Sequence, residues 1–461
     1  MFFAVSIAFV VFLLGVGFAA AGPVVPKSDP SSRLEKIAFS LTTGLLANHL
    51  ILLAVQSLQG SLWVGAAVAG CASVRILVRR RGRFRFKRDE DPFPLVMAVC
   101  VALLYYFTIL IEPLEDWDAR SIWFFHAKMI ASAESIGLTA GWDHPSLRFS
   151  HADYPNLIPA LAAQLSHLLG YWNEYMPKFS LFLVLIPPVF WVFSFWSRSF
   201  SFLLLALVFP FGLKGYLWSG SMDGYVALYA AVSMLLLGRY FVEGRMLDLM
   251  AGISCLAMAG NIKNEGILVG LIGVFAIAAT GIWTGKLGFT ALKKSFGPAR
   301  AAWLAVVLVP AAVWSVFYKH KWGLANDLQL GSAAALHRMM NRLSDGVSFP
   351  LILKETLFNT ESTVWLSLAA FAAGVILMTV AKRRTAGWMP ALVTAGVYYG
   401  CMVTVFLLIP NDPTVHLLSS LHRTMLTTSG CLVVGAYFAL REFEEAPPEP
   451  NPGLTRNRTS A

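Results

Sequence analysis

The chain reads FPLVMAVCVALLYYFTILIEPLEDWDAR from residue 93 to residue 120. Residues 93–111 contain no charged side chain, and about 20 apolar residues are enough for an α-helix to cross a bilayer. Directly after this run, four carboxylates fall within residues 112–118, at Glu112, Glu115, Asp116 and Asp118. The stretch therefore predicts a membrane-spanning helix that ends at an acidic segment outside the lipid.

The composition of the whole chain agrees with this stretch. Of 461 residues, 57% are hydrophobic and only 13% are charged, and the mean hydropathy is +0.64. A soluble domain has about a quarter charged residues, so the composition excludes an ordinary soluble enzyme, a disordered protein and a disulfide scaffold. The five cysteines lie in or beside apolar runs and are interpreted as small buried hydrophobes. The predicted fold class is an all-α polytopic membrane protein.

Apolar runs of suitable length predict thirteen spans, within a range of about 11–14 transmembrane helices. The runs are 1–22, 37–57, 60–79, 93–112, 176–196, 199–217, 222–239, 246–260, 264–283, 300–318, 361–381, 389–409 and 422–440. The run 157–171 is interpreted instead as an interfacial or re-entrant segment, because a span there would move the later basic loops to the opposite face.

The basic residues predict the orientation of these spans. The net charge is +10, and basic residues concentrate in connections at 79–88, 239–245, 286–300 and 382–384. Cytoplasmic loops are enriched in Lys and Arg, so these connections are predicted to be cytoplasmic, with the N-terminus outside and the C-terminus inside. The same rule explains the positive charge without nucleic acid. The functional face is therefore predicted to lie outside the cytoplasm.

The predicted orientation leaves three longer segments outside: 113–175, 319–360 and 410–421. Residues 121–130 have apolar positions at helical spacing and predict a juxtamembrane helix on the membrane surface. We predict three regions: extra N-terminal helices with a basic loop (1–92), a catalytic membrane module (93–440) and a disordered tail (441–461).

Polar side chains gather at the predicted outer ends of the spans, which points to a functional face there. The acidic segment supplies Glu115, Asp116 and Asp118, followed by Arg120. The candidate residues elsewhere in the first exterior segment are His126, Lys128, His151, Asp153 and Tyr154. Lys263 and Glu265 lie between two spans, and Arg423 is expected to begin the final helix. Asp223, at the start of another span, is a weaker candidate.

At these residues the sequence resembles the GT-C superfamily of integral-membrane glycosyltransferases, and distantly the group of protein mannosyltransferases and aminoarabinose lipid A transferases. The likeness consists of the acidic motif Glu115 to Asp118, an aromatic juxtamembrane helix, the proline-containing helix start at Asp153 to Pro155, the island Lys263 to Gly266 and the late segment that ends at Arg423. Three spans precede the helix that leads into the acidic loop, whereas in many relatives that helix is the first. The resemblance implies a bacterial inner (plasma) membrane with a periplasmic functional face.

The resemblance implies transfer of a sugar from a polyprenyl-phosphate donor to a hydroxyl of a glycan, lipid or protein acceptor, with inversion. Asp116 or Asp118 would be the base, with Glu115 third, and the two aspartates rank equally. Lys263, Arg423 and Arg120 would bind the donor phosphate. His126, Lys128, His151, Asp153, Tyr154 and Glu265 would contact substrate. The superfamily allows a divalent metal, Mg or Mn, but no metal-ligand constellation is evident in the sequence.

Other functional classes remain open at this point. A transporter or flippase for a lipid-linked or anionic substrate would place Lys263 and Glu265 near mid-membrane. A polysaccharide polymerase or ligase would use the same lipid-phosphate leaving group. A membrane scaffold without chemistry is the third alternative, against which the acid cluster argues.

Overall fold

The computed structural model describes residues 1–25, 31–79, 91–206, 214–286, 297–324, 330, 332–359, 363–380, 386–410 and 412–445. These residues form helices and connecting turns, and the described part of the chain contains no strand, only an isolated bridge between Ser57 and Ser135. The prediction of an all-α protein is confirmed. The prediction of a disordered tail lies mostly outside the described residues, which end at 445.

Seven helices in the described ranges are long and apolar enough to cross a membrane. They are α1 (Phe2–Ala21), α2 (Arg33–Val55), α4 (Phe93–Ile111), α10 (Met222–Glu243), α12 (Asn264–Thr284), the run Pro298–Lys321 and α19 (Met389–Leu408). The run Pro298–Lys321 consists of α14 (Pro298–Ala312), the π-helix η5 (Val313–Tyr318) and α15 (Lys319–Lys321). The chain is therefore a multi-pass membrane protein.

Four more predicted spans are helices: α3 (Leu58–Arg79), α7 (Phe179–Phe193), α11 (Met246–Ile262) and α18 (Val364–Val380). The predicted span 199–217 differs, because its described parts are two short helices, α8 (Phe200–Ala206) and α9 (Lys214–Trp218), and 207–213 lie outside the described residues. The last predicted span begins later than expected, as α21 (Leu426–Glu444). Residues 441–444, which were predicted to belong to the disordered tail, are helical.

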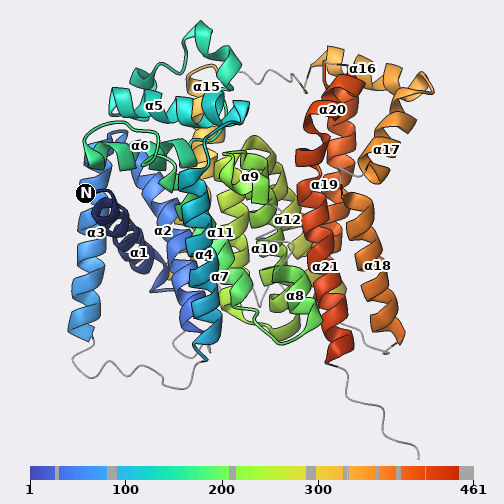
Figure 1. Ribbon diagram of the computed structural model, residues 1–461, viewed down its shortest axis with the longest axis horizontal. Helices are drawn as coiled ribbons and strands as arrows, with labels where there is room; N and C mark the ends of the chain where they lie inside the picture. The colour runs from blue at the N-terminus through green and yellow to red at the C-terminus, as the bar shows by residue number, and fades with distance from the viewer. Residues whose placement is uncertain are drawn as a thin grey trace, which may run out of the picture.

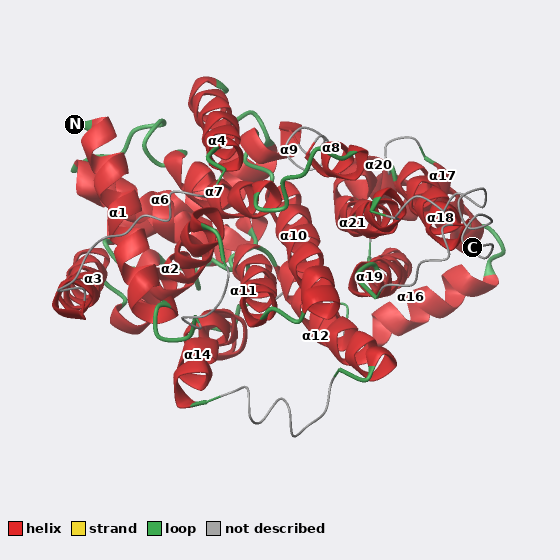
Figure 2. Cartoon of the chain, turned by 90° about the horizontal axis from the view of Figure 1, so that it is seen from below, coloured by secondary structure: helices red, strands yellow, loops and turns green. Residues whose placement is uncertain are grey.

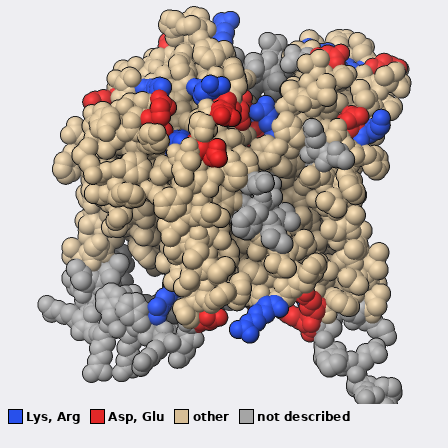
Figure 3. All heavy atoms as spheres, viewed as in Figure 1, with Lys and Arg blue, Asp and Glu red and all other residues tan. Residues whose placement is uncertain are grey.

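The spanning helices stand side by side, and shorter helices cover one end of the bundle, the upper end in Figure 1 (Figures 1 and 2). The upper end contains α5 (Phe124–Ala133), α15, α16 (Ala333–Ser344) and α20 (Pro413–Thr424), with α17 (Ser348–Phe358) descending from it. On the face in Figure 3, charged side chains form an upper band and a lower edge, separated by a belt that is almost free of charge. Such a belt suits the hydrocarbon core of a bilayer.

The predicted juxtamembrane helix is present. The π-helix η1 (Ala119–Trp123) continues into α5, and two 3-10 turns, η2 (Leu138–Ala140) and η3 (Pro145–Ser150), lead to α6 (Leu157–Leu169). A helix of 13 residues is about 20 Å long, shorter than the ~30 Å core of a bilayer. The interpretation of residues 157–171 as something other than a span therefore agrees with the structure.

The N-terminal helices share the core of the rest of the protein. Phe9 and Leu45 belong to the same buried cluster as Val184 of α7 and Val434 of α21. The ring of Phe39 on α2 lies 5.9 Å from that of Trp303 on α14. Residues 1–92 are thus packed into the bundle, although they precede the acidic loop.

Glycines bring α1 and α2 into backbone contact. A Cβ added to Gly17 would lie 1.8 Å from the carbonyl oxygen of Ser40, whereas one added to Gly70 of α3 would meet nothing within 4 Å. We expect Gly17→Ala to lower the free energy of unfolding by about 1–3 kcal/mol, because the two helices must move apart. Gly70→Ala, the matched control, should change it by less than about 0.5 kcal/mol. Thermal unfolding in detergent measures both, and equal midpoints for the two variants would contradict the close packing.

Four charged side chains form a buried cluster between α2, α10 and α11. Arg239 contacts both Glu35 and Asp248 at 2.6 Å, and Arg245 contacts Glu35 at 2.8 Å. Glu35 also closes a capping box with Ser32 at the start of α2. The basic connection predicted at 239–245 is therefore not an open basic loop, because acidic residues from two other segments neutralise both arginines.

Candidate functional site

The acidic segment leaves α4 and turns into η1 at the upper end of the bundle. The backbone N–H of Asp118 donates to Oδ1 of Asp116 at 3.1 Å, which fixes the turn. Asp118 Oδ2 accepts from Nη1 of Arg423 at 2.7 Å, across 305 positions of sequence. Arg423 lies in the last turn of α20, and Met425 separates α20 from α21. The expectation that Arg423 begins the final helix was therefore wrong.

A second ion pair lies beside the first. Asp223, in the first turn of α10, contacts Nζ of Lys263 at 2.8 Å, and only about 7% of either side chain is exposed. Lys263 is the extended residue that joins α11 to α12, and it also contacts Glu265 at 3.2 Å. Arg423 is close enough to both Asp116 and Asp223 to stabilise their negative charge. The two ion pairs therefore form one electrostatic unit.

A third group connects this unit to α15. Asp153 accepts from the amide of Asn264 at 2.7 Å and lies 3.6 Å from Nζ of Lys319. Lys319 donates in turn to Oδ1 of Asn264 at 2.7 Å. The indole N–H of Trp314 donates to the carbonyl of Asp153 at 3.3 Å. We call the set Asp116, Asp118, Asp153, Asp223, Lys263, Asn264, Glu265, Lys319 and Arg423 the polar network.

Aromatic rings form one side of the polar network. Tyr154 stacks between Trp123, at 5.4 Å between ring centroids, and His151, at 5.0 Å. Nζ of Lys263 lies 5.9 Å from the centre of the Tyr154 ring. Burial raises the pKa of the Tyr154 hydroxyl well above its usual value, so this group stays protonated at neutral pH. Of the predicted residues, Tyr154 thus lies beside Lys263, Asp153 lies beside Lys319, and His151 packs against Tyr154.

Asp116 differs from the other acids of the polar network. Among the residues that the structure describes, it makes no ion pair, whereas Asp118, Asp153 and Asp223 each contact a cation. Burial raises the pKa of the Asp116 carboxyl, and the nearby charges of Asp118 and Asp223 raise it further. The Asp118 backbone N–H and the Arg423 guanidinium act in the opposite direction without cancelling the shift. A half-buried carboxyl with a raised pKa is suited to accept a proton.

The other predicted site residues are not part of the polar network. Glu115 and Arg120 are exposed, and Arg120 donates to the carbonyl of Glu115 in its own loop. Lys128 pairs with Glu174 at 3.3 Å. Direct substrate contact by these three residues stays a prediction.

His126 is fully buried rather than at the surface. Its ring nitrogens lie 3.2 Å from Asn156 Oδ1 and 3.2 Å from Ser150 Oγ, and its ring packs against Trp142. Burial lowers the pKa of His126 to about 3, so the ring is neutral. In this structure the ring holds η3 and the start of α6 in place, and substrate binding through it stays a prediction.

The sequence analysis gave three members of the polar network too little weight or none. Asp223 ranked low, and Asn264 and Lys319 were not selected as site residues. All three lie within a few residues of a span end on the same side as Lys263. A rule that collects every polar residue at the outer span ends would have found them.

An open hollow of about 1180 Å³ borders the polar network at Lys319. The residues that line this hollow all fall between 312 and 324. They include His320, Lys321 and the exposed Val316 and Phe317. No group of three or more His, Cys, Asp or Glu in the described ranges is arranged to hold a metal ion, so no residues are assigned to Mg or Mn.

The chain was also compared with known proteins. No protein-family model, curated protein or solved structure matches it.

Proposed function

We propose that the chain is a membrane glycosyltransferase of the GT-C type. It would transfer a sugar from a polyprenyl-phosphate donor to an acceptor hydroxyl at the exterior, periplasmic face of a bacterial inner membrane. The observation that supports this best is the position of Asp116, which makes no ion pair among the described residues. It lies near two ion pairs, one between Arg423 and Asp118 and the other between Lys263 and Asp223. A base and compensating positive charge are the two requirements of this reaction.

The proposed reaction is a single displacement. The acceptor hydroxyl attacks the anomeric carbon while Asp116 takes its proton. The bond from that carbon to the phosphate oxygen breaks, and its electron pair leaves with the polyprenyl phosphate. Attack opposite to the leaving group inverts the configuration. Asp116 ranks above Asp118 as the base, because Asp118 is held by Arg423 at 2.7 Å.

Arg423 and Lys263 would balance the charge that develops on the leaving phosphate. An arginine has five N–H donors in a planar fork, so Arg423 can hold Asp118 through Nη1 and still donate to phosphate oxygens. The hollow at Lys319 has basic residues above exposed apolar ones, an arrangement that suits a phosphate on a hydrocarbon chain. We assign the lipid part of the donor to this hollow.

The position of the polar network favours an enzyme over the transporter alternative. The helices that contribute to it meet at the upper end of the bundle, where α5 and α20 lie (Figure 1). A transporter is expected to place its substrate site near the middle of the bilayer. Lipid-linked substrate flux across proteoliposomes without sugar transfer would favour the transporter.

Binding of the leaving group tests the proposal. Purified protein should bind polyprenyl phosphate, and Arg423→Gln should weaken binding about tenfold or more, since a hydrogen bond to a charged group contributes about 1.5–3 kcal/mol. Arg148→Gln, at an exposed arginine outside the polar network, is the control. Equal dissociation constants for Arg423→Gln and the unaltered protein would remove the phosphate-binding role.

The raised pKa of Asp116 predicts the pH dependence of transfer. The base acts in its deprotonated form, so kcat/KM should fall as the pH drops through the pKa of Asp116, which is raised from the ordinary value of an aspartate. Arg423→Gln removes a charge that stabilises the carboxylate, so the acid limb of its profile should move to higher pH. The limb of Arg148→Gln should not move. If the acid limb of Arg423→Gln lies at the same pH as that of the unaltered protein, a group other than Asp116 is the base.

A further inference from the structure

Two cavities meet at the C-terminal end of α6, away from the polar network. One, of about 420 Å³, is a groove between α1 and α3 lined by Phe9, Phe12, Leu62, Trp63 and Ala66 among others. The other, of about 540 Å³, lies above α6 and is lined by Lys128, Glu134, Ser166 and Trp172 among others. His167 lines both. From the start of α6, which follows Asp153, to His167 the helix rises by about 15 Å, so the pair of cavities is not part of the proposed reaction site.

The groove between α1 and α3 opens on the outer surface of the bundle. Ala8 and Ala66 on its walls are exposed, and the side chain of Trp63 is 71% exposed. α1 and residues 58–74 of α3 are apolar, so we expect this surface to face hydrocarbon when the protein is in a bilayer. The occupant of such a groove is an acyl chain, since water has no access to it there.

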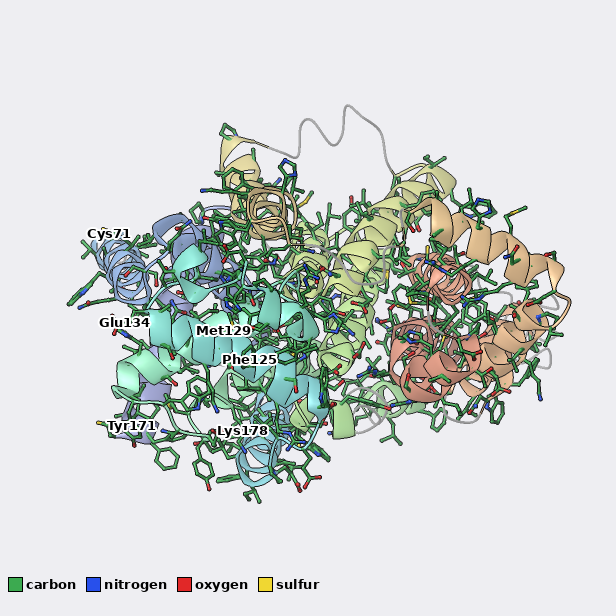
Figure 4. All side chains as sticks on the ribbon, turned by 90° about the horizontal axis from the view of Figure 1, so that it is seen from above. Cys71, Phe125, Met129, Glu134, Tyr171 and Lys178 are labelled. Atoms are coloured by element: carbon green, nitrogen blue, oxygen red, sulfur yellow. The ribbon has the colours of Figure 1, made fainter. Side chains whose placement is uncertain are left out.

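The cavity above α6 is polar and lies at the same edge of the molecule. Figure 4 shows Glu134 and Tyr171 at this edge, on the side where Cys71 marks α3. Ser166 lines the cavity, and only 3% of the residue is exposed. Its hydroxyl has no hydrogen-bond partner among the residues that the structure describes. Lys128 lies over the ring of Trp172 at 5.4 Å and pairs with Glu174 at 3.3 Å. Its side chain is half exposed, and an ammonium group has three N–H donors, so it can also donate to a ligand. A buried hydroxyl without a partner is costly unless a ligand satisfies it.

From this arrangement we infer a phospholipid-binding site on the N-terminal helices. One acyl chain lies in the groove between α1 and α3, and the phosphate lies at Ser166, His167 and Lys128. Tryptophan at the level of the headgroups is typical of membrane interfaces, which agrees with Trp172 above the groove and Trp63 within it. The site is independent of the proposed glycosyl transfer, and it gives α1 and α3 a function of their own.

Lipid titration followed by native mass spectrometry tests this site. The full chain is purified in detergent and titrated with phosphatidylglycerol. Ala66→Phe fills the groove, and Lys128→Gln removes the charge. Each should raise the dissociation constant of the tightest lipid adduct about tenfold. Ala4→Phe on the exposed face of α1, which does not line the groove, and Lys354→Gln on α17 are the matched controls and should bind as the unaltered protein does.

Further variants keep the test decisive. Ala8→Phe fills the groove from the opposite wall and should behave as Ala66→Phe does, and thermal unfolding checks that each variant is folded. Unchanged lipid binding by folded Ala66→Phe and Ala8→Phe would overturn the proposal. Competition by inorganic phosphate alone, with no effect of the groove variants, would likewise show that the site takes a free anion and not a lipid.

Discussion

We expect Asp116→Asn to lower kcat for sugar transfer by about 10²- to 10⁴-fold, the usual contribution of a positioned base. The asparagine side chain has the same shape, and its Oδ1 still accepts from the N–H of Asp118, so the turn is kept. It cannot take a proton from the acceptor hydroxyl. Because Asp116 does not hold the phosphate in the proposed mechanism, the KM for the donor should change little.

The control for this variant is Asp143→Asn, the same substitution at an exposed residue of the same exterior segment. It should retain the activity of the unaltered protein. A kcat for Asp116→Asn within a factor of two of the control would remove Asp116 from the mechanism.

Asp118→Asn should give a different kinetic signature. The substitution removes the ion pair that holds Arg423 at 2.7 Å. Since Arg423 binds the donor phosphate in the proposed mechanism, the KM for the donor should rise, whereas Asp116→Asn affects kcat. A loss confined to kcat in Asp118→Asn, with Asp116→Asn active, would exchange the roles of the two aspartates.

The second large effect concerns stability. We expect Arg239→Met to lower the free energy of unfolding by about 3–5 kcal/mol, because it leaves Glu35 and Asp248 buried with their charge only partly compensated. The guanidinium also packs 4.0 Å from the ring centre of Phe195. Equilibrium unfolding in mixed micelles measures the change.

Arg148→Met is the matched control for Arg239→Met, since Arg148 is exposed. Its effect should stay within about 0.5 kcal/mol. Equal unfolding free energies for the two variants would show that the buried ion cluster does not stabilise the fold.

The helices were predictable because a chain in lipid must satisfy its backbone hydrogen bonds within each segment. Apolar runs such as 93–112 and 389–409 therefore became α4 and α19 almost residue for residue. The run 199–217 shows the limit of this rule. It was predicted as one span, but its described residues form two separate short helices, α8 and α9. The break at Met425 was also missed, because hydropathy does not report where a helix bends.

The composition of the polar network was partly predictable, and its pairing was not. Asp118, Asp153, Lys263 and Arg423 stood out as polar residues at the ends of apolar runs. Sequence spacing says nothing about which cation meets which acid when the partners are 305 residues apart, as Asp118 and Arg423 are. Lys128 and Arg120 were also predicted at the site, but Lys128 pairs with Glu174 and Arg120 donates to the carbonyl of Glu115.

One measurement tests the central proposal most directly: turnover of defined donors by the purified protein. The protein is reconstituted in nanodiscs with a panel of polyprenyl-phosphate monosaccharides, and release of free polyprenyl phosphate is followed for the unaltered chain, Asp116→Asn and Asp143→Asn. The proposal predicts release from at least one donor by the unaltered chain and Asp143→Asn, and almost none by Asp116→Asn. No release from any donor by folded protein, or equal release by Asp116→Asn, would contradict it.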